Sequence, residues 1–170
     1  MRRDRRALEE LSRRLWEERQ VVDHLLFKLT VTRLLLAADE RRFVPQALEE
    51  VELAVEALRQ GEYRRDEALR SLASLWSYDP AMLTLGELAR RSPPPFDHTF
   101  AEHAVAFRDL AVEIDQVARE NRVLANGDLQ VVAGQLDQLS GPQVPFTSTY
   151  DASGQLDGAG AVGARLREVF

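Results

Sequence analysis

Cysteine is absent from the 170-residue sequence, which excludes disulfide bonds, thiolate metal sites and cysteine nucleophiles. Aromatic residues are also few, at 7% of the chain, and the apolar content consists mainly of leucine, valine and alanine. This mixture suits helices that pack along their length better than a β-sandwich or a β-barrel. At this length we expect one domain, with two as the upper limit.

Long uncharged hydrophobic runs are missing as well. The most apolar window, residues 21–38, contains Asp23, His24, Lys28 and Arg33, and four ionisable groups would make insertion into a bilayer very costly. We therefore expect a buried helix here and no membrane insertion. The first twenty residues carry charges without an apolar core behind them, so we expect no secretory signal and a cytoplasmic location.

An excess of positive charge is also lacking. The chain has 28 acidic and 22 basic residues and a net charge of −6, so its electrostatics do not favour nucleic acid as a partner. The first turns nevertheless carry Arg2, Arg3, Arg5 and Arg6. Two interpretations of this segment stay open: a solvated, fraying helix end, or an electrostatic contact with an acidic partner.

Motifs for catalysis and metal binding are missing too. His98 and His103 are five residues apart, whereas two metal ligands on one helical face need a spacing of four, and the chain has no Glu-x-x-His pair. It contains neither the Gly-x-x-x-x-Gly-Lys-Ser/Thr loop that binds phosphate nor a Gly-x-Ser-x-Gly nucleophile turn. We therefore expect no enzymatic activity, no cofactor and no metal.

What the sequence does contain is helical periodicity. In residues 4–38 the apolar residues follow the alternating three- and four-residue spacing of a coiled-coil seam, with Glu18 and Thr32 at two positions within it. The apolar members of the seam are Leu8, Leu11, Leu15, Val22, Leu25, Leu29 and Leu36. A second row, made of Leu26, Phe27, Leu34 and Leu35, predicts that the second half of this helix is buried on more than one face.

A second long helix is predicted over residues 45–77. Pro45 fits its first turn, where a missing N–H costs nothing. Gly61 lies in its interior, at a cost of about 1 kcal/mol relative to alanine. We expect the helix to continue through this glycine, because the seam keeps its phase at Leu58, Glu62, Arg65 and Leu69.

The longest predicted helix covers residues 100–139, a proline-free stretch that would be about 60 Å long. A short amphipathic helix at 81–91 and a stiff proline link at 92–96 precede it, with Asp97 or Thr99 as its N-cap. Such a helix needs long partners beside it. The sequence therefore predicts an all-α protein: an elongated antiparallel bundle of three long helices, or a coiled-coil hairpin, with one short extra helix.

The second half of this longest helix is weakened. Asn126-Gly127 and Gly134 cost roughly 2 kcal/mol in helix propensity, and Asn121 lies on the seam, either as a buried residue that fixes register or as a surface residue. We divide the chain into a helical bundle domain, residues 1–140, and a flexible glycine-rich tail, residues 141–170. A weakened apolar helix that precedes a mobile tail can yield its contacts to a partner.

Five segments together resemble the FlgN family, the cytoplasmic export chaperones of bacterial flagellar hook-associated proteins. The resemblance covers residues 21–154, whereas Pro45, the arginine-rich first twenty residues and the long glycine-rich end depart from the family pattern. The segments are LLLAAD (34–39), QALEEVELAVEALRQGE (46–62), LTLGELARRSPPPF (83–96), EIDQVARENRVLANGDLQVV (113–132) and YDASG (150–154).

The resemblance implies a non-catalytic role. Such chaperones bind the C-terminal amphipathic helices of hook–filament junction proteins, prevent their premature assembly and bring them to the type III export apparatus. Recognition of a helix in a groove would use the second half of the longest helix, and Tyr150 is a candidate docking residue for the export apparatus, or else an unattached aromatic residue of the tail. The client-binding residues would be Leu124, Val131, Val132, Leu136 and Leu139.

Three further alternatives stay open at this point. A homodimer is compatible with the coiled-coil pattern. A structural or scaffolding coiled-coil protein would show the same periodicity without any export role. A small helical regulator that binds a helix of another protein would show it too.

Overall fold

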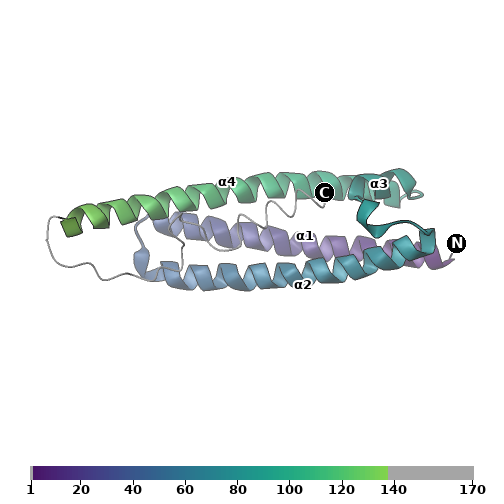
Figure 1. Ribbon diagram of the computed structural model, residues 1–170, viewed down its shortest axis with the longest axis horizontal. Helices are drawn as coiled ribbons and strands as arrows, with labels where there is room; N and C mark the ends of the chain where they lie inside the picture. The colour runs from purple at the N-terminus through teal and green to yellow at the C-terminus, as the bar shows by residue number, and fades with distance from the viewer. Residues whose placement is uncertain (1, 138–170) are drawn as a thin grey trace.

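Three long helices lie side by side in the computed structural model (Figure 1). The structure describes residues 2–137, and side chains for residues 2–127. The long helices are α1 (Arg2–Ala37), α2 (Val44–Trp76) and α4 (Phe96–Asp137), and the short elements are η1 (Arg41–Phe43), η2 (Pro80–Met82) and α3 (Leu85–Arg91). Every regular element in the described range is helical, which confirms the all-α prediction. None of these helices combines the length and the apolar character needed to cross a bilayer.

The central helix is α1. It packs against α2 on one side and against α4 on the other, whereas α2 and α4 make little contact with each other within the described residues. The chain runs back along α1 as α2 and then returns as α4 in the direction of α1 (Figure 1). The short helix α3 packs on α4 at the end of the molecule where α1 begins (Figure 1).

The predicted seam of α1 forms the middle of the core. Six of its seven apolar members are buried, and Leu36 at the end of the helix is half-buried. The two polar positions in the seam, Glu18 and Thr32, are fully buried as well. Thr32 satisfies its hydroxyl by donating a hydrogen bond to the carbonyl of Lys28, one turn earlier. The spacing of apolar residues therefore identified the buried face of this helix correctly.

The second apolar row of α1 is not buried as predicted. Phe27 and Leu34 are 56% and 58% exposed, while Leu26 and Leu35 are half-buried. The physical reason is the number of neighbours. Because α1 has only α2 and α4 beside it, the described residues leave a third side of the helix uncovered.

The seam of α2 passes through smaller residues than predicted. The helix does continue through Gly61, but Gly61 and Ala68 occupy buried positions, while Glu62 and Leu69 are only half-buried. A Cβ atom added to Gly61 would lie 3.8 Å from the Cβ of Glu18. Small residues on this face let α2 approach α1 closely where α1 carries a buried glutamate.

The longest helix begins earlier than predicted, at Phe96. Neither Asp97 nor Thr99 is its N-cap, because both lie inside the first turn, and the hydroxyl of Thr99 donates to the carbonyl of Pro95. The amide of Phe96 donates to the carbonyl of Pro93 at 3.0 Å, and the Pro94–Pro95 bond is cis. The proline run thus leads directly into the helix, since the first-turn amides of a helix need no internal acceptor.

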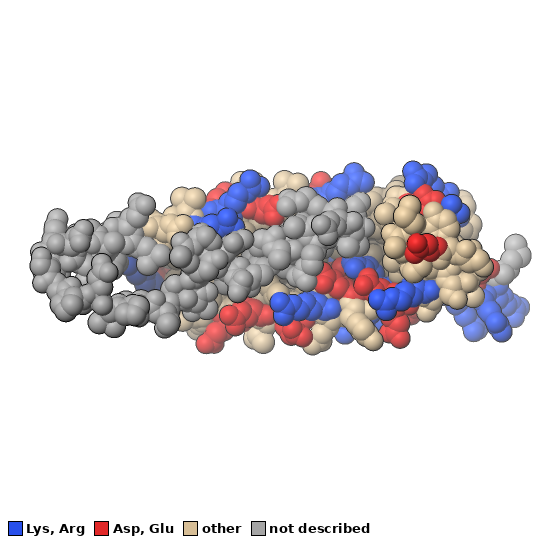
Figure 2. Space-filling view, viewed as in Figure 1, with Lys and Arg blue, Asp and Glu red and all other residues tan. Residues whose placement is uncertain are grey.

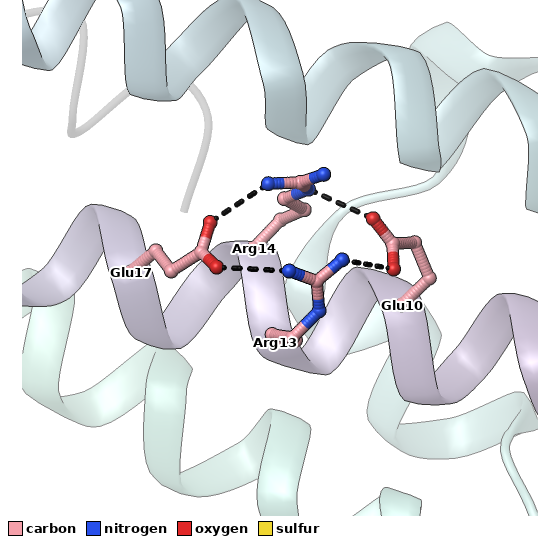
Figure 3. A network of polar contacts seen from close by, with 4 residues as sticks. All are labelled: Glu10, Arg13, Arg14 and Glu17. Atoms are coloured by element: carbon pink, nitrogen blue, oxygen red, sulfur yellow. Dashed lines mark hydrogen bonds and ion pairs between the residues drawn. The ribbon is translucent and has the colours of Figure 1, made fainter.

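The arginines of α1 fall into two groups. Those of the first turns, from Arg2 to Arg6, are exposed and gather at one end of the molecule (Figure 2). Arg13 and Arg14 are each bonded to both Glu10 and Glu17, which closes a network of four side chains on one helix (Figure 3). Such pairs add little to stability, because their charges remain largely hydrated.

A buried ion pair joins α1 to α2. Arg65 Nη1 lies 2.7 Å from Glu18 Oε1, and the two side chains are 7% and 0% exposed. A second nitrogen of Arg65 contacts Asp66 at 2.9 Å, while Glu18 Oε2 is buried with no hydrogen-bond partner among the described residues. Burial raises the pKa of Glu18 to about 7, against the opposing effect of the nearby Arg65. The cost of desolvating the carboxylate therefore exceeds what the guanidinium returns.

Glu18 should make stability depend on pH. Its pKa is about 7 in the folded chain and near 4.5 in the unfolded chain, so the native state holds a proton that the unfolded state releases. The contribution of this proton to the free energy of unfolding is complete below pH 4.5. It decreases by about 3 kcal/mol in total as the pH rises through 7. Urea unfolding of the wild type and of Glu18→Gln at pH 5 and pH 8 measures this loss. The variant should lack this part of the decline, and parallel pH profiles would contradict the assignment.

The net contribution of the Glu18–Arg65 pair to stability should be smaller than the loss of stability that follows when one partner is removed. Arg65→Met leaves Glu18 buried without its cation, so we expect a loss of about 3–5 kcal/mol at pH 8 and a smaller loss at pH 5, where Glu18 is protonated. The double variant Glu18→Leu/Arg65→Met removes both charges and should recover most of that stability. A double variant as unstable as Arg65→Met at pH 8 would show that the pair itself stabilises the bundle.

Candidate functional site

The apolar core ends well before α4 does. On α4 its last member is Val117, followed one turn later by the buried amide of Asn121. The helix continues to Asp137. The second half of α4 thus has a helical backbone without the core packing that holds the first half, as far as the described side chains extend.

Asn121 closes the core with a hydrogen bond to α1. It is 2% exposed, which decides between the two interpretations of this residue in favour of the buried one. Its Nδ2 donates to the carbonyl of Leu29 at 3.1 Å, and its Oδ1 is buried without a hydrogen-bond partner among the described residues. A buried amide with one acceptor fixed on the opposite backbone sets the register of α4 against α1.

A charged pair lies beside this amide. Arg33 Nη1 donates to Glu120 Oε2 at 2.6 Å, and this hydrogen bond, together with one from Gln116, holds the pKa of the Glu120 carboxyl below its usual range. Lys28 makes a comparable bond of 2.6 Å to Glu50 on α2. Polar contacts therefore fasten the second half of α1 to both of its neighbours.

Among the described residues, the register of these contacts leaves the end of α4 without a partner helix. Because Arg33 lies level with Glu120 and α1 ends at Ala37, the end of α1 is level with about residue 125 of α4. The last dozen or so residues of α4 extend past that point, and Figure 1 shows this end projecting beyond α1 and α2. We call residues 124–137 the α4 end.

The predicted client-binding residues fall mostly on the α4 end. Leu124 is half-buried, beside the exposed Val123. Val131, Val132 and Leu136 belong to the last ten residues of α4, of which the structure describes the backbone alone. Leu139 and Tyr150 lie outside the described residues, as does the predicted tail.

Sequence reasoning missed two features of this region. It did not assign Val123 to the binding surface, because this residue lies off the seam that periodicity selects. Val123 is 70% exposed. It also missed the Arg33–Glu120 pair, since a single sequence does not show which exposed charges of two helices face each other. At Gly127, a Cβ atom added to the glycine would meet nothing within 4 Å.

The chemistry of the described residues fits a binding surface better than a reaction centre. Residues 2–127 contain no group of three or more histidine, aspartate or glutamate side chains placed to hold a metal ion. His103, the one buried histidine among them, lies beneath Trp16 with ring centroids 6.4 Å apart, and burial lowers its pKa. The described residues therefore present helix surfaces to which a partner can bind.

Comparison with known proteins places the chain in a family. A family model described as FlgN protein matches residues 1–158, which include all of the described elements. Searches of curated proteins and of solved structures gave no significant match. FlgN proteins are chaperones of flagellum assembly and not a family of enzymes. Because the match spans nearly the whole sequence, the chain belongs to the FlgN family of flagellar export chaperones.

Proposed function

We propose that this chaperone binds the C-terminal amphipathic helices of hook-associated proteins in the cytoplasm, prevents their premature assembly and aids their delivery to the type III export apparatus. The observation that carries the proposal is the α4 end, which continues beyond the core and beyond the end of α1. Family membership supports the chaperone role in general. The choice of hook–filament junction proteins as clients is part of the proposal, and it is based on the role of the family in flagellum assembly.

The client helix would pack against the α4 end, which has no partner helix among the described residues. Val132 and Leu136 are one turn apart, and position 132 lies three turns after Asn121 on the same helical face. A client helix laid along this face would continue the line of contacts that α1 makes up to Asn121. We include Leu124, Val131 and Leu139 in this surface, as the sequence pattern suggests.

The affinity of such a contact should be moderate. Burying about 600 Å² of apolar surface is worth roughly 15 kcal/mol before the costs of association, at about 25 cal/mol per Å². Ordering the partner and losing its translational freedom remove most of this. We expect micromolar binding, which suits a client that has to be released for export.

The scaffold that we propose is residues 1–140 as an antiparallel bundle of three long helices, followed by a separate tail, residues 141–170. The buried contacts of α1 with α2 and α4 support this division, and the short remainder after α4 is too rich in glycine to form a core of its own. The bundle would present the α4 end, while Tyr150 in the tail would contact the export apparatus. A homodimer stays open, because the described residues leave a third side of α1, with Phe27 and Leu34, uncovered.

Client binding should depend on the apolar face of the α4 end. We expect Val132→Asp/Leu136→Asp to lose co-purification with a co-expressed hook-associated protein, because two charges would have to enter the apolar contact. Leu53→Asp/Tyr63→Asp is the matched control: both residues are exposed on α2, so this variant should co-purify as the wild type does. Circular dichroism checks that all variants keep their helices.

Two results would contradict this proposal in different ways. If the wild-type chain does not co-purify with any hook-associated protein of the same bacterium, the proposed clients are wrong. If the wild type binds and Val132→Asp/Leu136→Asp binds equally well, the clients are right and the position of the site is wrong.

Tyr150 should matter for export and not for client binding. We expect Tyr150→Ala to retain the client with unchanged affinity while secretion of that client falls several-fold, since the variant removes an aromatic contact of the tail and leaves the α4 end intact. Titration calorimetry and quantification of secreted client measure the two effects. Unchanged secretion would favour the alternative of an unattached tail residue.

A further inference from the structure

A groove follows the line along which α1 and α4 meet. Two adjoining hollows, of about 470 and 700 Å³, share Arg19 and Glu102 as walls. Together they run along α4 from Phe96 to Glu113, a length of about 25 Å, or nearly five helical turns. We call this the α1–α4 groove. It ends before the α4 end begins, so it is separate from the proposed client surface.

Apolar side chains border the groove on both helices. Trp16 on α1 and Val105 on α4 line it and are more than half exposed. Val112, also more than half exposed, follows Val105 by seven residues and therefore lies on the same face of α4. Trp16 and Val105 therefore give a partner an apolar contact on each side of the groove.

The charge of the groove is mainly negative in the half that continues toward Glu113. Four acidic residues line this half, Asp23, Glu102, Asp109 and Glu113, against Arg19 and His98. Arg19 is placed over the ring of Trp16, 5.6 Å from its centroid, and His98 lies 3.3 Å from Glu102. The other three acids make no ion pair within the described part of the chain.

The opposite half does not balance this charge. It is lined by Arg13 and Arg19 and by Glu9 and Glu102. Arg13 is already bonded to Glu10 and Glu17 in the network of Figure 3. Beneath this half, the Nδ1 atom of His103 is buried without a hydrogen-bond partner among the described residues.

We propose that the α1–α4 groove binds an amphipathic helix of a partner protein whose apolar face is flanked by lysine or arginine. The groove has the length of a helix of about 17 residues, apolar borders that such a helix would cover, and acids placed to pair with its basic flanks. Recognition of a helix in a groove supplies the affinity, and the charges supply specificity and rate of association. A second copy of the chain fits less well, because two acidic grooves brought face to face would repel each other.

A designed helix tests this surface without any knowledge of the natural partner. The probe is a fluorescein-labelled 18-residue peptide with leucines on one face and lysines on its flanks, titrated into the full chain and followed by anisotropy. A Trp76→Phe chain retains Trp16 as its one tryptophan, so docking should shift the Trp16 emission to the blue. We expect micromolar binding that weakens with salt, and binding at least tenfold weaker for a peptide with glutamate in place of each lysine.

Charge reversal in the groove provides the matched comparison. Asp109→Lys/Glu113→Lys should weaken binding of the lysine peptide at least tenfold. Glu49→Lys/Glu52→Lys makes the same change of charge at exposed positions of α2 and should leave binding within twofold of the wild type. Both pairs of substitutions are on exposed positions, and circular dichroism verifies that the variants fold.

Several outcomes would overturn the proposal. The lysine peptide would fail to bind or to shift Trp16, the glutamate peptide would bind as tightly, or the two double variants would weaken binding equally. A wild-type dimer in sedimentation that Asp109→Lys/Glu113→Lys dissociates would also overturn it, because the occupant of the groove would then be another copy of the chain. None of these results depends on the identity of the flagellar client.

Discussion

The structure depends on the burial of one helix between two others. A helix of the length of α1 gains little from its own hydrogen bonds in water and needs an apolar face covered by neighbours. Its seam of leucines is covered by α2 on one side and by α4 on the other, while α2 and α4 make little contact with each other. The molecule is therefore elongated, and within the described residues α2 and α4 are held mainly where α1 lies beside them, with α3 packed on the beginning of α4. The end of α4 beyond α1 lacks that support from the part of the chain that the structure describes.

Polar residues in the seam decide how the helices are aligned. Leucine contacts alone allow one helix to slide past another by a turn or a heptad at small cost. The Glu18–Arg65 pair and the amide of Asn121 prevent such sliding. A slip would leave a buried charge or a buried amide without its partner. Gly61 opposite Glu18 makes the same register the one with room for the glutamate side chain. Fixing the alignment therefore costs some stability. The raised pKa of Glu18 reflects this cost, because it results from burying the carboxylate.

Much of this arrangement is visible in the sequence, and the failures have physical causes. The seam of α1 could be predicted because its spacing is regular over four turns and more. On α2 the predicted positions Leu58 and Arg65 are buried, but Gly61 and Ala68 are buried in place of Glu62 and Leu69, because close packing favours the smaller residue where periodicity favours the larger one. The exposure of Phe27 and Leu34 could not be predicted, because hydrophobicity does not tell how many neighbours a helix has. Of the candidate site, the sequence located the helix, while the pairing of Arg33 with Glu120 required the structure.

The account therefore assigns different tasks to the two halves of α4: the first half completes the bundle, and the second half is available to a client. Hydrogen–deuterium exchange of the full chain, alone and with a hook-associated protein, tests this division most directly. We predict slow exchange of residues 100–117 in both states, and fast exchange of residues 124–137 in the free chain that becomes slow in the complex. Protection already present at 124–137 in the free chain, or client-induced protection confined to residues outside α4, would contradict it.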